Sequence, residues 1–203
     1  MKRSKGIFGF SQANYQLRAV FTKAVKEFKA ADAEKKKIDR EYKLGKCLMD
    51  AVFHRMERRT EVGTILVILA IAVLEEAINN YAFTFLEPDF YENDLVKSSL
   101  LTKWLLLPRI CQNKEVEGND PFINELRALI KARNAIVHQR TYELGDKKVS
   151  RDLARFNQAC KKASSTVDGL INILTSLPLG AKKPETACTE KEHHPQSPLK
   201  IRA

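Results

Sequence analysis

Residues 62–74 read VGTILVILAIAVL, the longest uncharged apolar run of the chain, and Glu75 and Glu76 follow it directly. A helix that spans a membrane needs about 20 apolar residues, so this run is too short for one. Its apolar positions go nearly all round a helix, which is typical of a helix buried on every side. We therefore expect a central core helix over residues 61–86, ended by Glu87-Pro88-Asp89, in a cytoplasmic protein with no membrane segment.

The remaining sequence also has helical character. Apolar residues recur every three or four positions over residues 11–59, which predicts one long helix or two. Further helices are expected over residues 93–110, 120–139 and 150–176. Asp120-Pro121 marks a start, because Asp is a good N-cap residue and Pro is tolerated at the first helical position.

Together these segments predict an all-α fold, an antiparallel bundle of four to five helices. The 203 residues are 44% hydrophobic, which is enough for one domain with its own core. We place that domain at residues 11–177. Residues 1–10 are expected to be flexible, and residues 178–203 have the composition of a disordered tail.

The charge of the chain is strongly basic, with a formal net charge of +10, and the excess lies toward its two ends. Residues 1–61 carry 16 Lys or Arg against 8 Asp or Glu. A basic surface attracts RNA or DNA through counterion release. The alternative is an ordinary soluble helical surface with a lysine bias. Lys35, Lys36 and Lys37 have the same two interpretations, a solvated helix face or a patch that contacts RNA.

Metal chemistry has little support in the sequence. The four cysteines, at positions 47, 111, 160 and 188, form no close pair, so they predict reduced thiols and no zinc site. We expect no metal and no cofactor.

The helix expected over residues 120–139 carries charges where apolar residues should lie. Its apolar stripe runs through Phe122, Leu126 and Ile130 to Arg133 and Val137, which puts Arg133 at a core position. A buried guanidinium needs a carboxylate partner or must reach out to solvent. Two acidic residues of the core helix could supply that partner: apolar periodicity favours Glu76, and alignment with a known family, described below, favours Glu75.

A second stripe of the same helix is polar and cationic. It consists of Arg127, Lys131, Asn134 and His138, at spacings of four, three and four residues. Asn134 and His138 lie one turn apart, so the amide can orient the imidazole or help to hold an anion. This stripe is the candidate for RNA contact and for catalysis, and Arg140 lies just beyond it.

An Arg followed by a His at this spacing is a weak signal alone, but its context resembles a known family. Residues 125–138 read ELRALIKARNAIVH and are similar to the motif helix of the HEPN family (higher eukaryotes and prokaryotes nucleotide-binding). Residues 74–82 read LEEAINNYA and resemble a second helix of that family, in which an acidic residue faces the motif. The resemblance extends over about residues 60–175.

The resemblance implies a helical bundle that dimerises and brings two copies of Arg133 and His138 into one cleft. Many members are metal-independent ribonucleases of toxin or defence systems. In such an enzyme His138 acts as general base or acid, Arg133 stabilises charge on the phosphate, and Asn134 positions it. The alternative is a catalytically inactive HEPN module that binds a nucleotide or another protein.

The resemblance also suggests partners. RNA and a second copy of the chain are expected, together with an antitoxin or a nucleotidyltransferase. Some members carry a Tyr two residues after the His, which the nucleotidyltransferase modifies. That position is Arg140 here, and the nearest tyrosine is Tyr142.

Overall fold

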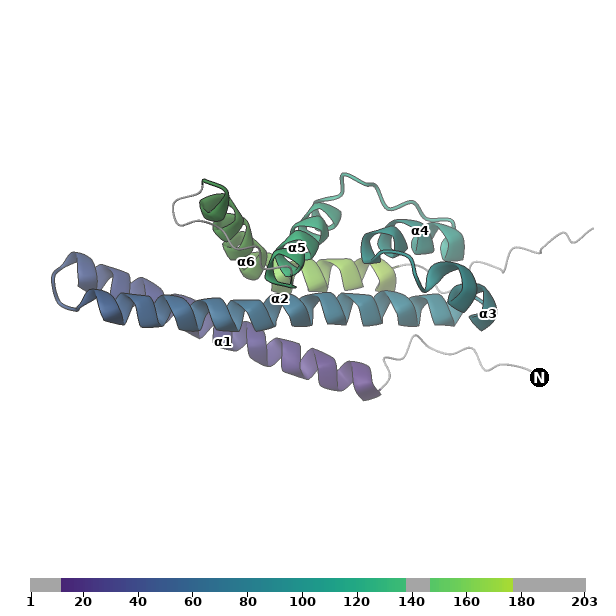
Figure 1. Cartoon of the computed structure of the whole chain (residues 1–203). Helices are drawn as coiled ribbons and strands as arrows, with labels where there is room; N and C mark the ends of the chain where they lie inside the picture. The colour runs from purple at the N-terminus through teal and green to yellow at the C-terminus, as the bar shows by residue number, and fades with distance from the viewer. Residues whose placement is uncertain (1–11, 138–146, 177–203) are drawn as a thin grey trace, which may run out of the picture.

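The computed structural model describes residues 12–137 and 147–176, and within these ranges all regular structure is helical (Figure 1). The all-α class is therefore confirmed, with six helices packed together where we expected four to five. The segments expected to be flexible or disordered, residues 1–10 and 178–203, lie outside the described residues. The elements are α1 (Gln12–Lys43), α2 (Met49–Phe85), α3 (Pro88–Phe90), a π-helical turn (Tyr91–Leu95), α4 (Leu100–Gln112), α5 (Pro121–Val137) and α6 (Lys147–Thr175).

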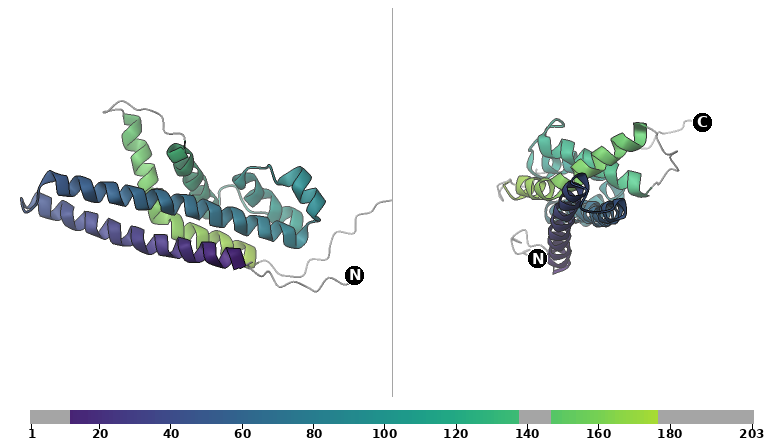
Figure 2. Two further views of the ribbon diagram at one scale, coloured as in Figure 1. Left: turned by 60° about the horizontal axis from the view of Figure 1, so that its bottom comes forward. Right: turned by 90° about the vertical axis from the view of Figure 1, so that its left-hand side faces the viewer.

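The first two helices form a long antiparallel hairpin (Figures 1 and 2). Its turn is at Gly45, whose φ of 67° lies in the left-handed region where a residue without a Cβ is favoured. The sequence left open whether residues 11–59 form one helix or two. The structure has two helices, and α2 begins at Met49 rather than at residue 61.

Helix α2 is the central element of the core, as the apolar run predicts. It contacts α1, α4, α5 and α6. Its buried apolar residues are Leu66, Val67, Ala70, Ile71, Val73, Leu74, Ala77, Ile78, Tyr81 and Ala82. The long apolar run thus forms the part of α2 on which the other helices pack.

Helix α1 is buried over only part of its length. Its buried stripe is Phe21, Ala24, Phe28 and Ala31, and no residue of the segment 33–58 is buried. We call this segment the distal hairpin. Figures 1 and 2 show it extending past the other helices at one end of the molecule.

The connection after α2 is more broken than the single helix expected over residues 93–110. The one-turn α3 leads into the π-helical turn, and α4 starts only at Leu100. Ser99 caps α4, its side-chain oxygen accepting a hydrogen bond from the Thr102 N–H at 3.1 Å. Pro108 is buried inside α4.

Candidate functional site

Helix α5 carries Arg133 and Asn134, two of the three predicted catalytic residues, and its start is as predicted. The Asp120 carboxylate accepts hydrogen bonds from the backbone N–H groups of Phe122, at 2.7 Å, and Ile123, at 3.4 Å. Pro121 is the first helical residue. The helix then runs to Val137, the last residue described before residue 147.

The buried side of α5 is not the one that we predicted. The buried residues are Ile123, Leu126, Leu129 and Ala132, at steps of three. Phe122 and Ile130 are half-buried, and Val137 is 55% exposed. The predicted and observed stripes share Leu126 and diverge from it in both directions. The predicted stripe took steps of four, four, three and four, and that register carried it off the core face at Arg133.

Arg133 is exposed, so the core position that periodicity gave it is wrong, and of the two alternatives for its guanidinium the one found is contact with solvent. One of its guanidinium nitrogens donates a hydrogen bond to the side-chain oxygen of the adjacent Asn134 at 3.2 Å. An exposed guanidinium is solvated and needs no carboxylate. The physical reason for pairing it with Glu75 or Glu76 is therefore also wrong.

The two glutamates differ from each other in environment. Glu75 is exposed, whereas Glu76 is half-buried, and burial raises the pKa of its carboxyl group. Periodicity had singled out Glu76 as the more inward of the two, and its greater burial agrees with that.

The cationic stripe of α5 is on the surface only in part. Arg127 is half-buried, and its guanidinium donates to the Gly118 carbonyl oxygen and to the Asn124 side chain, which ties α5 to the preceding loop. Lys131 and Asn134 are exposed. The stripe therefore presents one cation and one amide to solvent beside Arg133. His138 and Arg140 lie outside the described residues.

The three consecutive lysines of α1 each have a carboxylate partner within the same helix. Lys35 pairs with Asp39, Lys36 with Asp32 at 2.8 Å, and Lys37 with Glu41 at 3.9 Å. These i, i+4 pairs lower the charge that the lysines offer to a polyanion. Contact of these lysines with RNA stays a prediction.

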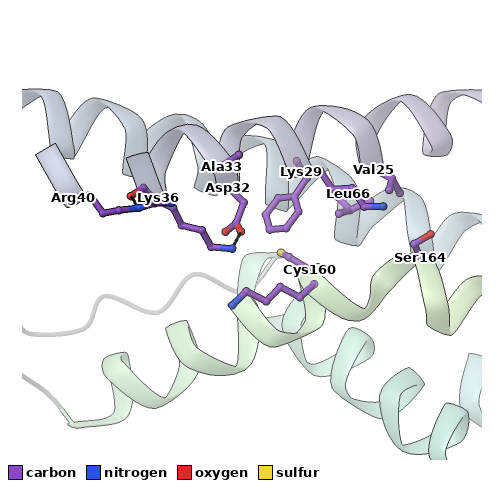
Figure 3. A pocket seen from close by; sticks show the side chains of 11 residues that line it. Val25, Lys29, Asp32, Ala33, Lys36, Arg40, Leu66, Cys160 and Ser164 are labelled. Atoms are coloured by element: carbon purple, nitrogen blue, oxygen red, sulfur yellow. Dashed lines mark hydrogen bonds and ion pairs between the residues drawn. The ribbon is translucent and has the colours of Figure 1, made fainter. Parts of the chain in front are cut away.

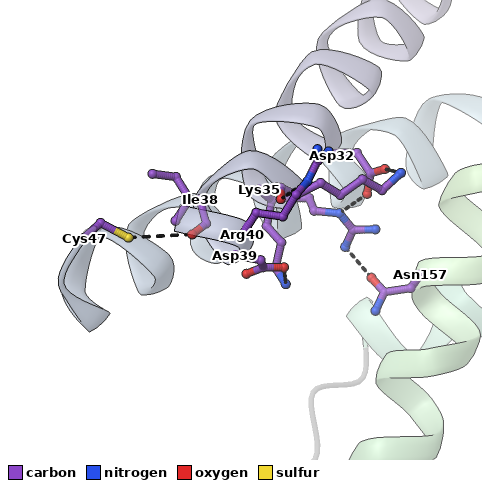
Figure 4. A network of polar contacts seen from close by, with 9 residues as sticks. Asp32, Lys35, Ile38, Asp39, Arg40, Cys47 and Asn157 are labelled. Atoms are coloured by element: carbon purple, nitrogen blue, oxygen red, sulfur yellow. Dashed lines mark hydrogen bonds and ion pairs between the residues drawn. The ribbon is translucent and has the colours of Figure 1, made fainter. Parts of the chain in front are cut away.

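The sequence did not reveal a polar cluster that joins α1, α2 and α6 (Figure 4). Arg59 of α2 is buried, and its Nε donates to the Asp32 carboxylate of α1 at 2.6 Å. A second guanidinium nitrogen donates to the side-chain oxygen of Asn157 on α6, and the guanidinium carbon lies 5.1 Å from the centre of the Phe28 ring. The cluster sits where the distal hairpin leaves the core.

The protonation of Asp32 reflects this environment. Burial raises the pKa of its carboxyl group, but hydrogen bonds from Lys36 and Arg59, with their positive charges, outweigh burial and hold the pKa below its ordinary value. Asp32 is therefore an anion at neutral pH, paired with two cations.

A cavity of about 370 Å³ opens next to this cluster, between α1 and α6 (Figure 3). In Figure 3, Asp32 and Lys36 extend from α1 toward Cys160 of α6. Its full lining is Val25, Phe28, Lys29, Asp32, Ala33, Lys36, Arg40, Leu66, Cys160, Lys161 and Ser164. Finding it from the sequence would have required the position of the hairpin turn.

Over residues 12–137 and 147–176, no three His, Cys, Asp or Glu side chains come together as a set that could hold a metal ion. In the same ranges, no helix combines the length and the apolar character that crossing a bilayer requires.

Comparison of the chain with protein-family models, with curated proteins and with solved structures gives no match. Function is therefore argued from the residues of this chain.

Proposed function

We propose that the chain is a metal-independent, HEPN-type endoribonuclease that acts as a homodimer. The observation that carries the proposal is at the end of α5, where Arg133 and Asn134 lie side by side in solvent. Asn134 is four residues before His138 in the sequence. This sequence context is the one that resembles the HEPN motif helix. Lys131, one helical turn before Asn134, adds a further exposed cation.

The proposed chemistry assigns one task to each of the three residues. His138 takes the proton of a ribose 2′-hydroxyl, whose oxygen attacks the neighbouring phosphorus atom. Arg133 stabilises the negative charge that develops on the phosphate oxygens, and Asn134 holds the phosphate in place. The protonated His138 of the second copy donates a proton to the 5′-oxygen as the bond from phosphorus to that oxygen breaks, and the other product ends in a 2′,3′-cyclic phosphate.

A second copy of the chain is part of the proposal because a single chain leaves the end of α5 uncovered. Arg133, Asn134, Ala135 and Val137 are all exposed, and Val137 exposes 55% of its apolar surface. An active site gains electrostatic strength when water is excluded from it. A second α5 packed across this turn would exclude water and place two arginines near two histidines.

The first test is cleavage of single-stranded RNA in EDTA by wild type, His138→Ala and Arg133→Ala. We expect wild-type cleavage to survive chelation and to leave 2′,3′-cyclic phosphate ends, with each variant slower by about 10²-fold or more. His54→Ala and Arg109→Ala are the matched controls, because both residues are exposed and lie on other helices. Equal RNA loss in wild type and His138→Ala would contradict the proposal.

The composite site has a separate test by mixing. Arg133→Ala and His138→Ala homodimers are denatured together and refolded, so that mixed dimers form. A site shared between two chains should regain part of the activity in the mixture, because a mixed dimer holds one intact Arg133 and one intact His138. Activity that stays at the level of the separate variants would exclude sharing across the dimer.

The second candidate function is binding without turnover, and the exposure of Arg133 favours it. A solvated guanidinium contacts phosphate without the desolvated surroundings that strengthen transition-state charge stabilisation. In that case Arg133→Ala weakens RNA binding, measured by fluorescence anisotropy, while no cyclic-phosphate product forms from the wild-type protein.

A further inference from the structure

We propose that the cavity between α1 and α6 binds a small ligand that carries several phosphate groups. The cavity is separate from the end of α5, and the proposal does not depend on ribonuclease activity. Its volume of about 370 Å³ falls in the range of small-molecule sites, roughly 300–1,000 Å³. A duplex nucleic acid does not fit a cavity of that size.

The charge of the lining selects an anion. Four cationic side chains line the cavity: Lys29, Lys36 and Arg40 from α1, and Lys161 from α6. Asp32 is the one carboxylate among the lining residues. It is already paired with Lys36 at 2.8 Å and, at its other oxygen, with Arg59 at 2.6 Å.

Among the described residues, three of the four cations have no acidic partner of their own. Over residues 12–137 and 147–176, no carboxylate lies within ion-pair distance of Lys29, Arg40 or Lys161. The Nε of Arg40 donates to the Lys36 carbonyl oxygen at 3.3 Å, which leaves its terminal nitrogens for a ligand. Lys35 and Lys37 of the same helix, by contrast, pair with their own carboxylates and do not line the cavity.

The arrangement favours a chain of phosphates over a single phosphate. Lys29 and Arg40 are eleven residues apart on α1, which is about 16 Å along a helix that rises 1.5 Å per residue. One phosphate cannot reach both ends of that row. Lys161 comes from the opposite wall, and Val25, Phe28 and Leu66 provide an apolar floor. An oligophosphate, free or attached to a nucleoside, matches both the row of cations and the size of the cavity.

The test measures binding of sodium tripolyphosphate, ATP and inorganic phosphate to the full chain by isothermal titration calorimetry, in EDTA. We expect tripolyphosphate to bind at least tenfold more tightly than phosphate. The double variant Lys29→Ala/Lys161→Ala should weaken tripolyphosphate binding at least tenfold. Lys26→Ala/Lys46→Ala is the matched control, because it removes two exposed lysines outside the cavity lining and should bind as wild type does.

The outcomes separate the sources of the phosphate. Equal affinity for tripolyphosphate and ATP identifies the phosphate chain as the ligand, and tighter binding of ATP adds a contact for the nucleoside. Equal weakening of tripolyphosphate binding in the cavity variant and in its control would overturn the proposal, because binding would then depend only on the net charge of the protein. Binding of single-stranded RNA without any binding of tripolyphosphate would overturn it as well.

Discussion

The buried pair between Arg59 and Asp32 should be the most sensitive polar contact of the fold. We consider the substitution Arg59→Met, which keeps the length of the side chain and removes its charge. Asp32 then loses its bond from the Arg59 Nε, and Asn157 loses the guanidinium that joins α6 to the base of the hairpin. The change leaves a carboxylate in a position where only 16% of its side chain meets solvent.

The loss of unfolding free energy follows from the burial of Asp32 and from the ion pair that it keeps with Lys36. Removing one partner of a buried ion pair costs about 3–5 kcal/mol. Asp32 keeps Lys36 at 2.8 Å, so we expect the lower end of that range, about 3 kcal/mol. For a chain of this size each kcal/mol lowers the Tm by about 2–4 °C, which gives a fall of roughly 6–12 °C.

Urea and thermal unfolding followed by circular dichroism measure the effect. Arg58→Met is the matched control, because the neighbouring Arg58 is 57% exposed and pairs with Glu34 at 3.5 Å on the surface. It should cost less than about 1 kcal/mol. In a double-mutant cycle with Asp32→Leu, we expect a coupling of at least about 1 kcal/mol. A cost for Arg59→Met no larger than that of the control would refute the reasoning.

The same pair gives the stability of the protein a dependence on pH. Because the pKa of folded Asp32 lies below that of the unfolded chain, about 3.9, its contribution is fully present above that value. It is lost as the pH falls through the folded pKa. The difference in unfolding free energy between wild type and Arg59→Met should therefore be constant from pH 5 to 7 and shrink below pH 4. A difference that grows on acidification would contradict the assignment.

Three further predictions concern the packing of the other helices. Gly169→Ala should lower the unfolding free energy by about 1–3 kcal/mol in urea, because the new Cβ would fall 2.3 Å from the Phe122 ring; unchanged stability would mean that this ring moves aside freely. Lys103→Met should leave the free energy of unfolding equal or higher, because the buried ammonium has only a neutral hydrogen-bond partner, the Asn79 side-chain oxygen at 3.1 Å. A loss above about 2 kcal/mol would show that this hydrogen bond outweighs the cost of burying the charge. Burial raises the pKa of Cys160 to about 12, so peptide mapping should find it unmodified by a thiol reagent at pH 8 in native protein and modified in urea.

The core helix and the start of α5 could be predicted because their signals are local. An apolar run with no polar face can only be buried. The Asp120 carboxylate caps α5 by a hydrogen bond to a backbone N–H only two residues away, so this signal is also local. The hairpin turn gave no such signal. Gly45 stands alone without a nearby Pro, and apolar residues continue at helical spacing on both sides of it. The position of the turn then decides which residues of α1 and α2 face each other.

The polar cluster could not be predicted for that reason. Asp32 and Arg59 are 27 positions apart, and they meet only because the chain reverses at Gly45. A turn at another position would have paired different residues. Asn157 is a further 98 positions from Arg59, on a helix whose packing the sequence does not specify.

The error over Arg133 has a similar cause. Two stripes cross at Leu126, and both satisfy spacings of three and four over a helix of this length. The neighbours decide between them: the Thr166 hydroxyl of α6 donates to Glu125 at 2.7 Å, and the Phe122 ring lies against Gly169. These contacts orient α5 so that Leu129 and Ala132 face the core and Arg133 faces solvent.

An exposed Arg133 changes what the ribonuclease proposal requires. A buried guanidinium would have formed a site within one chain, whereas a solvated one must be enclosed by a second copy before it can stabilise a transition state strongly. The cavity between α1 and α6 needs no second copy, because one chain supplies all of its lining. Val137→Glu, which puts a charge on the exposed apolar end of α5, should therefore abolish RNA cleavage and leave tripolyphosphate binding unchanged. Sedimentation velocity on the same samples should find a monomer. Cleavage that persists in a monomeric variant would rule out the shared site, and loss of tripolyphosphate binding in a folded monomer would show that the cavity also depends on the dimer.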